Sequence, residues 1–403
     1  MRPIRSTIPI DEALAIVEGA ARPIERTERV GLAEASGRVL ASAIVSGRDV
    51  PPFDRAAMDG YAVRAADTAG AGPDSPTTFR LIETVHTGRL PSREVIAGGC
   101  TEIATGAPMP DGADAVVIVE ETERDGETIR VYTSVEERQH VGRRGADIRS
   151  GQALLEPGDF LTPSRVGSIA ALGVAEVDVY DRPRVGLLST GDEIVEPGEP
   201  LAPGQIYDVN RYTMASVIAA HGGRATIHPI TGDSVAALGA AVEAIIDAGA
   251  DILVFSGGSS VGERDLTLDV MRERGEVLFH GIAVKPGKPT AFGRIGATPV
   301  FGMPGYPTSC LSNAYLLLLP FLRRTARLRP HEARTVRAPA AHRFASPANR
   351  HQFYTVRLVD GAAVGAFKAS GDITSMSQAD GYIEIPIGVG AIDAGTTVDV
   401  TLF

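Results

Sequence analysis

The sequence predicts a multidomain chain that combines a central α/β domain, built on a mostly parallel sheet, with two β-rich regions. Its 403 residues are too many for one hydrophobic core, so several domains are expected. Between residues 184 and 324, apolar runs of strand length alternate with segments of helical periodicity, which favours a βαβ series. On either side, at 79–140 and after 325, short strand patterns are separated by glycine-containing turns.

Changes of pattern along the chain predict where the domains begin and end. We expect an N-terminal or linker domain formed by residues 1–45 and 141–180, interrupted by a β-rich insertion at 46–140. Residues 181–326 then form the α/β domain, and residues 327–403 form a small, barrel-like C-terminal β domain.

Charge and composition exclude several classes of protein. The net charge of −11 argues against a general nucleic-acid or membrane-surface binder, because both of those partners are themselves acidic. No apolar run approaches the length of a membrane span, and the N-terminus lacks the apolar region of a signal peptide. The two cysteines, Cys100 and Cys310, form no disulfide or zinc pattern, so a reducing cytoplasm is the expected location.

Polar clusters follow the predicted strands of the α/β domain. Ligands bind such sheets beyond the carboxyl ends of the strands. We therefore expect these clusters to meet there, at 190–193, 230–233, 256–265 and 303–306. The helix after the first of these strands is predicted to be capped by Asn210.

The most informative stretch, DILVFSGGSSVGERD, reads as a buried strand, a Gly/Ser-rich loop and a helix. That geometry presents backbone N–H groups and a positive helix end to an anion. Lys285 and Lys288 follow on either side of Pro286-Gly287, and lysine is a mobile point charge suited to phosphate. Asp265, just beyond the glycines, can hold a cation that phosphates also bind. The stretch therefore predicts a phosphorylated ligand with a divalent metal.

Three carboxylates of this domain could share that metal: Glu193, Asp233 and Asp265. Oxygen ligands without a histidine or cysteine cluster favour Mg²⁺ over a transition metal. The alternative role for each carboxylate is to cap a helix. This alternative applies most strongly to Asp233, which lies directly before a predicted helix. The chain has no G-x-x-x-x-G-K-[ST] loop and no G-x-G-x-x-G strand–helix turn, which disfavours a P-loop nucleotidase and a dinucleotide-binding domain.

Three further polar segments lie before the α/β domain. PPFDRAAMDGYAV crowds Asp59 and other charged residues around Gly60, ATGAPMPDGAD places Thr105 in a run of turns, and RRGADI places Asp147 in an arginine cluster. Each has a structural alternative: an elaborate turn, a hydroxyl that stabilises a turn, and a solvated linker.

Seven motifs, taken together, resemble the molybdopterin molybdenumtransferase family, which includes bacterial molybdenum-cofactor proteins and the C-terminal domain of gephyrin. The motifs occur in order from about residue 10 to the end of the chain: FDRAAMDGYAV, ATGAPMPDGAD, RRGADI, STGDE, SGGSSVGERD, KPGKP and MPGYPTS. The resemblance implies an elongated homodimer with four domains per chain, of which the α/β domain has the molybdopterin-binding fold.

The implied reaction starts from adenylated molybdopterin: molybdate enters the dithiolene, the adenylate is hydrolysed with Mg²⁺, and AMP and molybdenum cofactor are released. The upstream adenylyltransferase is a candidate partner. The resemblance implies catalytic roles for Asp59, Thr105, Asp147, Glu193 and Asp265, and metal ligation by Glu193, Asp233 and Asp265. It implies that substrate is bound by Ser189, Thr190, Gly191, Ser256, Gly257, Gly258, Ser259, Ser260, Gly262, Lys285, Lys288, Pro304 and Gly305. Arg350 and Ser370 are weaker candidates for the same site.

The chain departs from the family pattern at two places. It has Gly305-Tyr306-Pro307 where many relatives have Gly-Asn-Pro, and Gly258-Ser259-Ser260 where many have Gly-Val-Ser. Neither removes a charged group, so we expect activity to survive. The alternatives are an insertase that uses tungstate, the adenylyltransferase that shares the α/β domain, and a non-catalytic pterin-binding scaffold. Because the implicated residues come from the insertion and from the α/β domain, we expect the cleft to form between two subunits.

Overall fold

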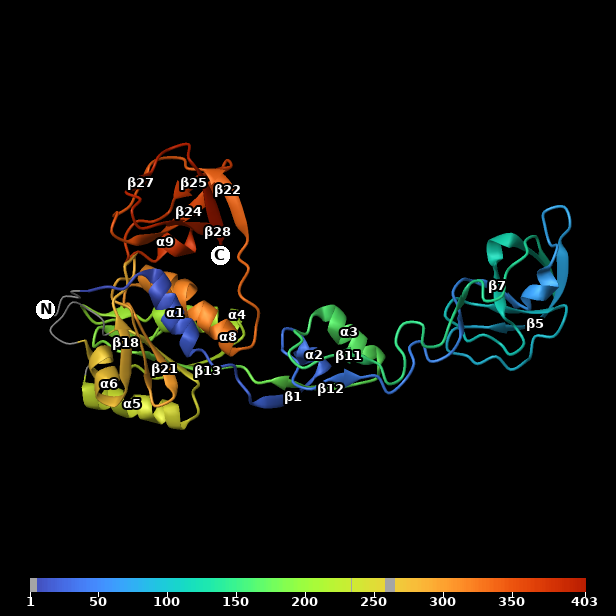
Figure 1. Ribbon diagram of the computed structural model, residues 1–403, viewed down its shortest axis with the longest axis horizontal. Helices are drawn as coiled ribbons and strands as arrows, with labels where there is room; N and C mark the ends of the chain where they lie inside the picture. The colour runs from blue at the N-terminus through green and yellow to red at the C-terminus, as the bar shows by residue number, and fades with distance from the viewer. Residues whose placement is uncertain (1–5, 233, 258–264) are drawn as a thin grey trace. The chain divides into compact units, whose positions relative to one another are not determined.

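A computed structural model describes residues 6–232, 234–257 and 265–403. The chain divides into two compact units (Figure 1). One contains the described residues of 1–28, 37–39 and 180–403, and the other contains residues 29–36 and 40–179. In the described part of the chain, no helix is both long and apolar enough to cross a membrane.

The first unit contains a six-stranded α/β sheet of mixed direction. Its strands, in spatial order, are β16 (Arg224–Ile227), β13 (Arg184–Ser189), β17 (Ile252–Ser256), β21 (Thr298–Met303), β20 (Ala291–Ile295) and β18 (Glu276–His280). The pairs from β16 to β21 are parallel, as predicted, whereas β20 pairs antiparallel with both β21 and β18. The expectation of a mostly parallel sheet therefore holds: three of the five pairs are parallel, and β20 alone runs against the other strands, because the short turn at Gly296 that joins it to β21 allows only an antiparallel pair.

Helices cover both faces of this sheet, so its central strands are apolar on both sides. In β17, Ile252 and Val254 join one core with α1 (Ile10–Ala20), α4 (Asn210–Ala220), α7 (Pro307–Asn313) and α8 (Leu319–Thr325). Leu253 and Phe255 join another core with α5 (Val235–Asp247) and α6 (Leu266–Arg274) (Figure 1). Successive side chains of a strand point to opposite faces of the sheet. Because helices cover both faces, every residue of β17 is buried.

The same unit ends in a second sheet with its own apolar core. Its strands, in spatial order, are β19 (Val284–Lys285), β24 (His351–Val359), β26 (Gly381–Ile385), β28 (Thr397–Leu402) and β22 (Thr335–Pro339), with β25 (Ala362–Gly365) paired to β24. Smaller elements are α9 (Thr374–Ser377) and the pair β23 (Phe344–Ala345) and β27 (Ala391–Ile392). Strand β19, which carries Lys285, joins this sheet and not the α/β sheet.

The second unit contains the predicted β-rich insertion and a smaller helical part. The insertion sheet has the order β7 (Ala115–Ile118), β4 (Gly60–Val63), β6 (Gly99–Ile103), β5 (Thr77–Val85), β9 (Thr128–Val131) and β8 (Thr122–Asp125). In the helical part, α2 (Leu32–Ala35) and α3 (Pro163–Ala171) contribute to a separate core with β2 (Ile44–Val45), β11 (Ala153–Leu155) and β12 (Glu176–Tyr180). Two short strands, β3 (Arg55–Ala56) and β10 (Val141–Gly142), pair between these parts.

Candidate active site

Three of the predicted loops meet at the carboxyl ends of β13, β17 and β21, and the fourth, after β16, joins them where the Thr231 N–H donates to the Ser189 carbonyl at 3.1 Å. The Thr190 N–H donates to the Ser256 carbonyl at 3.3 Å, which joins the first two loops. A Cβ atom built on Gly305 would lie 3.6 Å from the Gly257 Cα atom, so the third loop lies against the second. The structure therefore brings Thr190, Gly257 and Gly305 together, and Ser189, Ser256 and Pro304 directly precede them.

Gly257 is the point of closest approach in this group. Its φ is +93°, a left-handed conformation that favours glycine, and a Cβ there would lie 2.5 Å from the Thr190 carbonyl oxygen. No side chain fits at this position, so the loop needs glycine on both conformational and steric grounds. Its continuation through Gly258, Ser259, Ser260 and Gly262 lies outside the described residues.

Asp265 begins helix α6 beside the same loop. Its Oδ1 accepts a hydrogen bond from the Leu268 N–H at 3.0 Å and caps the helix, while Thr267 Oγ1 donates to the Gly257 carbonyl at 3.4 Å. The Oδ2 atom lies 3.6 Å from His280 Nε2, and the Asp265 side chain is 13% exposed. Burial and the nearby Arg272 lower the pKa of His280, which keeps that ring neutral at pH 7. Asp265 therefore does cap helix α6, as the structural alternative proposed, and this bond also holds its carboxylate close to Gly257, where the glycine loop begins.

Glu193 follows the neighbouring strand exit. Gly191 has a φ of +142°, a conformation that favours glycine, and a Cβ on it would lie 2.7 Å from Glu193 Oε2, so a side chain there would also displace this carboxylate. The Glu193 backbone carbonyl accepts from the Ile206 N–H at 2.8 Å, where β14 (Ile194–Val195) and β15 (Ile206–Tyr207) pair. The Glu193 side chain itself is exposed.

The third predicted metal ligand, Asp233, lies outside the described residues. Its neighbour Ser234 caps α5 by accepting from the Ala237 N–H at 3.1 Å. Among the described residues, no three His, Cys, Asp or Glu side chains gather as a metal site. Glu193 and Asp265 nonetheless offer carboxylate oxygens on neighbouring strand exits. That donor set fits Mg²⁺, which binds through one or two carboxylates and takes its other ligands from phosphates and water.

The two lysines lie on a loop fixed by buried hydrogen bonds. The Gly287 carbonyl accepts from Asn313 Nδ2 and from Thr290 Oγ1, both at 2.9 Å, and the Lys288 carbonyl accepts from the Ile282 N–H at 3.0 Å. Both lysine side chains are half-buried. Because Asn313 ends the helix that begins just after Gly305, the lysine loop is tied to the strand exits through α7.

The C-terminal sheet contributes a loop that contacts the predicted site. This loop, after β25, is hydrogen-bonded to helix α7: the Thr308 N–H donates to the Ser370 carbonyl at 3.2 Å, and Thr308 Oγ1 donates to the Asp372 carbonyl at 3.0 Å. Tyr306, which is 66% exposed, faces Gly371 in this loop. Arg350 precedes β24, the strand that pairs with the lysine strand β19. These contacts place Ser370 and Arg350, the two weaker candidates, near the predicted site.

One contributor was assigned the wrong role from sequence. Asn210 was predicted to cap α4, but it is the first residue of the helix, and Val209 occupies the cap position without a side-chain bond. The Asn210 side chain is buried and its Nδ2 donates to the Gly305 carbonyl at 2.8 Å. Asn at a helix start is common for local reasons, so no signal in the sequence separates a cap from this longer-range contact.

In the second unit, Asp59 and Thr105 form a pair. Asp59 Oδ1 accepts from the Thr105 N–H at 2.7 Å and from Thr105 Oγ1 at 2.9 Å, although 46 residues separate them. These two bonds hold the pKa of Asp59 below its usual value, the backbone bond contributing most. The carboxylate therefore stays charged to a lower pH than an ordinary aspartate, and its contribution to stability is lost as the pH falls through this lowered pKa.

Asp147 lies on an exposed loop of the same unit. Its N–H donates to the Val50 carbonyl at 3.1 Å. Two carboxylates shape the loop: Asp54 Oδ1 accepts from the Arg144 N–H at 2.7 Å, and Asp49 Oδ2 accepts from Arg144 Nε at 2.6 Å. The positioning role of Asp49 was missed, because nothing in the sequence pairs it with an arginine 95 positions later.

Family models match three consecutive parts of the chain. Residues 8–173 match the MoeA N-terminal region (domains I and II), residues 186–324 match a probable molybdopterin-binding domain, and residues 337–403 match the MoeA C-terminal region (domain IV). The chain belongs to the MoeA family. The resemblance inferred from the seven motifs is thereby confirmed, together with the multidomain fold.

Individual MoeA relatives match along nearly the whole chain. Molybdopterin molybdenumtransferase 2 of Mycobacterium tuberculosis is 34% identical over 412 residues, covering 98% of this chain and 99% of the relative. The molybdopterin molybdenumtransferase of Haemophilus influenzae is 39% identical over 298 residues, covering 74% and 72%. Two solved MoeA structures from Pyrococcus horikoshii align with TM-scores of 0.85 and 0.82 at 40% and 31% identity. They cover 98% and 99% of this chain, and 99% and 100% of the solved chains.

Proposed function

We propose that this MoeA-family chain inserts molybdate into adenylated molybdopterin and hydrolyses the adenylate with Mg²⁺, releasing AMP and molybdenum cofactor. The observation that carries the proposal is the meeting of the Thr190, Gly257 and Gly305 loops at one sheet edge, with Asp265 capping the adjoining helix. A glycine loop of this kind lets a phosphate approach the backbone closely. The names of the full-length relatives support the same reaction.

Each group has a task that follows from its chemistry. Lys285 and Lys288 would attract the two anionic reactants, the diphosphate bridge and molybdate. Glu193 and Asp265 would hold Mg²⁺, with Asp233 a predicted third ligand. When bound, Mg²⁺ neutralises phosphate charge and polarises the bond to be broken. The cysteines have no part in this scheme, because burial raises the pKa of both Cys100 and Cys310 to about 12 and keeps the thiols protonated.

We further propose that the working form is a homodimer in the cytoplasm. Asp59, Thr105 and Asp147 belong to one compact unit, and Asp265, Glu193 and the lysines belong to the other. In a two-fold symmetric dimer, the insertion of one subunit can face the α/β domain of its partner. Both cysteines are free and buried, in keeping with a reducing compartment.

The reaction is tested by following AMP release from adenylated molybdopterin with Mg²⁺ and with molybdate, tungstate or no oxyanion. We expect release to depend on molybdate, because insertion and hydrolysis belong to one reaction. Faster release with tungstate would identify a tungstate-using insertase. Equal release without any oxyanion would contradict the proposal. Conversion of unmodified molybdopterin and ATP to the adenylate would identify the adenylyltransferase, and absence of any turnover would identify a scaffold.

A further inference from the structure

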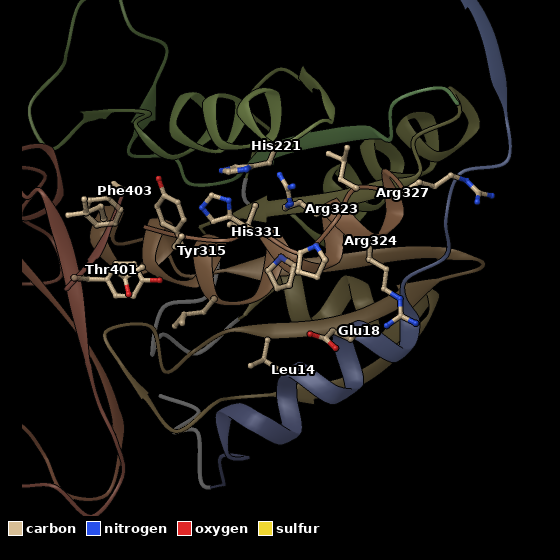
Figure 2. Close-up of a pocket in the computed structure, with 18 of the residues that line it drawn as sticks. Leu14, Glu18, His221, Tyr315, Arg323, Arg324, Arg327, His331, Thr401 and Phe403 are labelled. Carbon is tan, nitrogen blue, oxygen red and sulfur yellow. The ribbon is translucent and has the colours of Figure 1, made fainter. Parts of the chain in front are cut away.

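A separate cavity of about 720 Å³ lies in the first unit, between α8, the end of α4 and the C-terminal sheet (Figure 2). Its volume falls in the range that accommodates a small organic ligand. None of the residues assigned to the reaction line it. Helix α4 separates the two places: its first residue, Asn210, contacts the Gly305 loop, and His221, just after its last turn, lines the cavity. Eleven helical residues rise roughly 16 Å, so the cavity is remote from the strand exits.

One end of the cavity is basic. It is lined by Arg323, Arg324 and Arg327, and Glu18 is the single acidic side chain among its described lining residues. In the part of the chain that the structure describes, no carboxylate lies within 4.0 Å of a side-chain nitrogen of these three arginines. Most of the ion pairs that the described residues form do contain an arginine, but it is always another one. Burial lowers the pKa of Arg323, which shows that its charge is incompletely hydrated. A partly desolvated guanidinium without a carboxylate is a strong site for an added anion.

Contacts hold two of the three arginine side chains in place, those of Arg323 and Arg327. Arg323 Nε donates to the Arg329 carbonyl at 2.7 Å, which fixes the guanidinium orientation. Arg327 Nε donates to the Ile24 carbonyl at 2.6 Å, and its guanidinium stacks on the Tyr180 ring at 4.0 Å. Arg323 therefore has a fixed position, and its two terminal nitrogens donate to no intramolecular acceptor among the described residues.

Two histidines complete the polar end. The rings of His221 and His331 meet edge to face, with centroids 5.0 Å apart, beside Arg323 (Figure 2). Burial, and then the neighbouring His331 and Arg323, lower the pKa of His221 to about 4. His221 is thus neutral at pH 7, and can donate or accept a hydrogen bond without adding a charge of its own.

The opposite end of the cavity is aromatic. Tyr315 lies with its ring centroid 5.3 Å from that of Phe403, and Tyr382 lies 5.6 Å from the same ring. Tyr382 is itself held by stacking on Phe353 at 3.9 Å. Figure 2 shows Tyr315 and Phe403 on one side of the cavity and the arginines on the other. Such flat, rigid surfaces suit an apolar or aromatic ligand body.

We propose that this cavity binds a small amphipathic anion, with its apolar body against Tyr315 and Phe403 and its charged group at Arg323 and Arg324. A ligand of this shape matches both ends at once: it covers exposed aromatic surface and supplies the missing counter-charge. The site is independent of the proposed reaction, because no residue assigned to that reaction contributes to it.

The probe for this site is 8-anilinonaphthalene-1-sulfonate, a fluorescent aromatic sulfonate, titrated into the full-length protein. Its neutral relative N-phenyl-1-naphthylamine keeps the aromatic body and lacks the anion. We expect Arg323→Gln and Arg324→Gln each to weaken sulfonate binding about tenfold, the effect of losing one charge-assisted contact. The neutral dye should bind both variants as it binds the parent protein.

Arg329→Gln is the matched control, since it removes the same charge from an exposed side chain that does not line the cavity. It should change the affinity by less than about twofold. Arg324 is exposed, so its replacement tests the site even if Arg323→Gln lowers the thermal unfolding midpoint. Two results would overturn the proposal: equal weakening by Arg329→Gln, or loss of dye binding in Lys285→Ala with Arg323→Gln and Arg324→Gln unaffected.

Discussion

An Asp265→Asn variant will remain folded and will lose AMP release by about 100-fold or more, the usual cost of removing a group that stabilises developing charge. Asparagine is as good a helix cap as aspartate, so the bond to the Leu268 N–H and the stability of α6 should persist. Only the negative charge beside the Gly257 loop disappears. Molybdate-dependent AMP release and the thermal unfolding midpoint are the two measurements.

Asp269→Asn is the control for this variant, because Asp269 lies in the first turn of the same helix and the substitution removes the same charge. It should retain AMP release close to the parent rate. Raising the Mg²⁺ concentration should partly restore Asp265→Asn if the carboxylate holds the metal. An unchanged rate in Asp265→Asn would leave Asp265 as a helix cap and nothing more.

The second large effect is expected at Asp59. Asparagine at this position can still accept both Thr105 hydrogen bonds, so the turn should keep its conformation while the charge is lost. AMP release should fall by about 100-fold, whereas the proposed dimer and the melting temperature should be preserved. Asp74→Asn, in an exposed turn of the same unit, is the control with an equal change of charge. A similar fall in both variants would point to the overall charge of the unit instead of a specific role for Asp59.

Local patterns were enough to predict most elements of the fold. The four consecutive apolar residues of DILVFS predicted a buried strand, and the structure covers this strand with helices on both sides. The glycine that ends this strand, Gly257, has the left-handed conformation that suits a turn, whereas the loop predicted after it lies outside the described residues. The reversed direction of β20 was not foreseen, although the turn at Gly296 between β20 and β21 is too short for the crossover that a parallel pair needs.

Sequence analysis could place a residue of the candidate site where its neighbours in the sequence indicate its position. It could not do so where the position depends on a contact with a residue far along the chain. Asp265 follows the glycine loop directly, so its place was evident. The side chain of Asn210 reaches a carbonyl 95 positions away, and the lysine strand joins the C-terminal sheet. Tertiary contacts of this kind override local propensity, which accounts for the wrong assignment of Asn210 as a helix cap.

The most direct test of the account is complementation between the two inactive variants. If Asp59 of one subunit and Asp265 of its partner serve one site, a heterodimer of Asp59→Asn and Asp265→Asn chains contains one doubly altered site and one intact site. Differently tagged chains, co-expressed and purified through both tags, should then release AMP at roughly half the parental rate per dimer. A heterodimer as inactive as either homodimer would contradict a site shared between subunits.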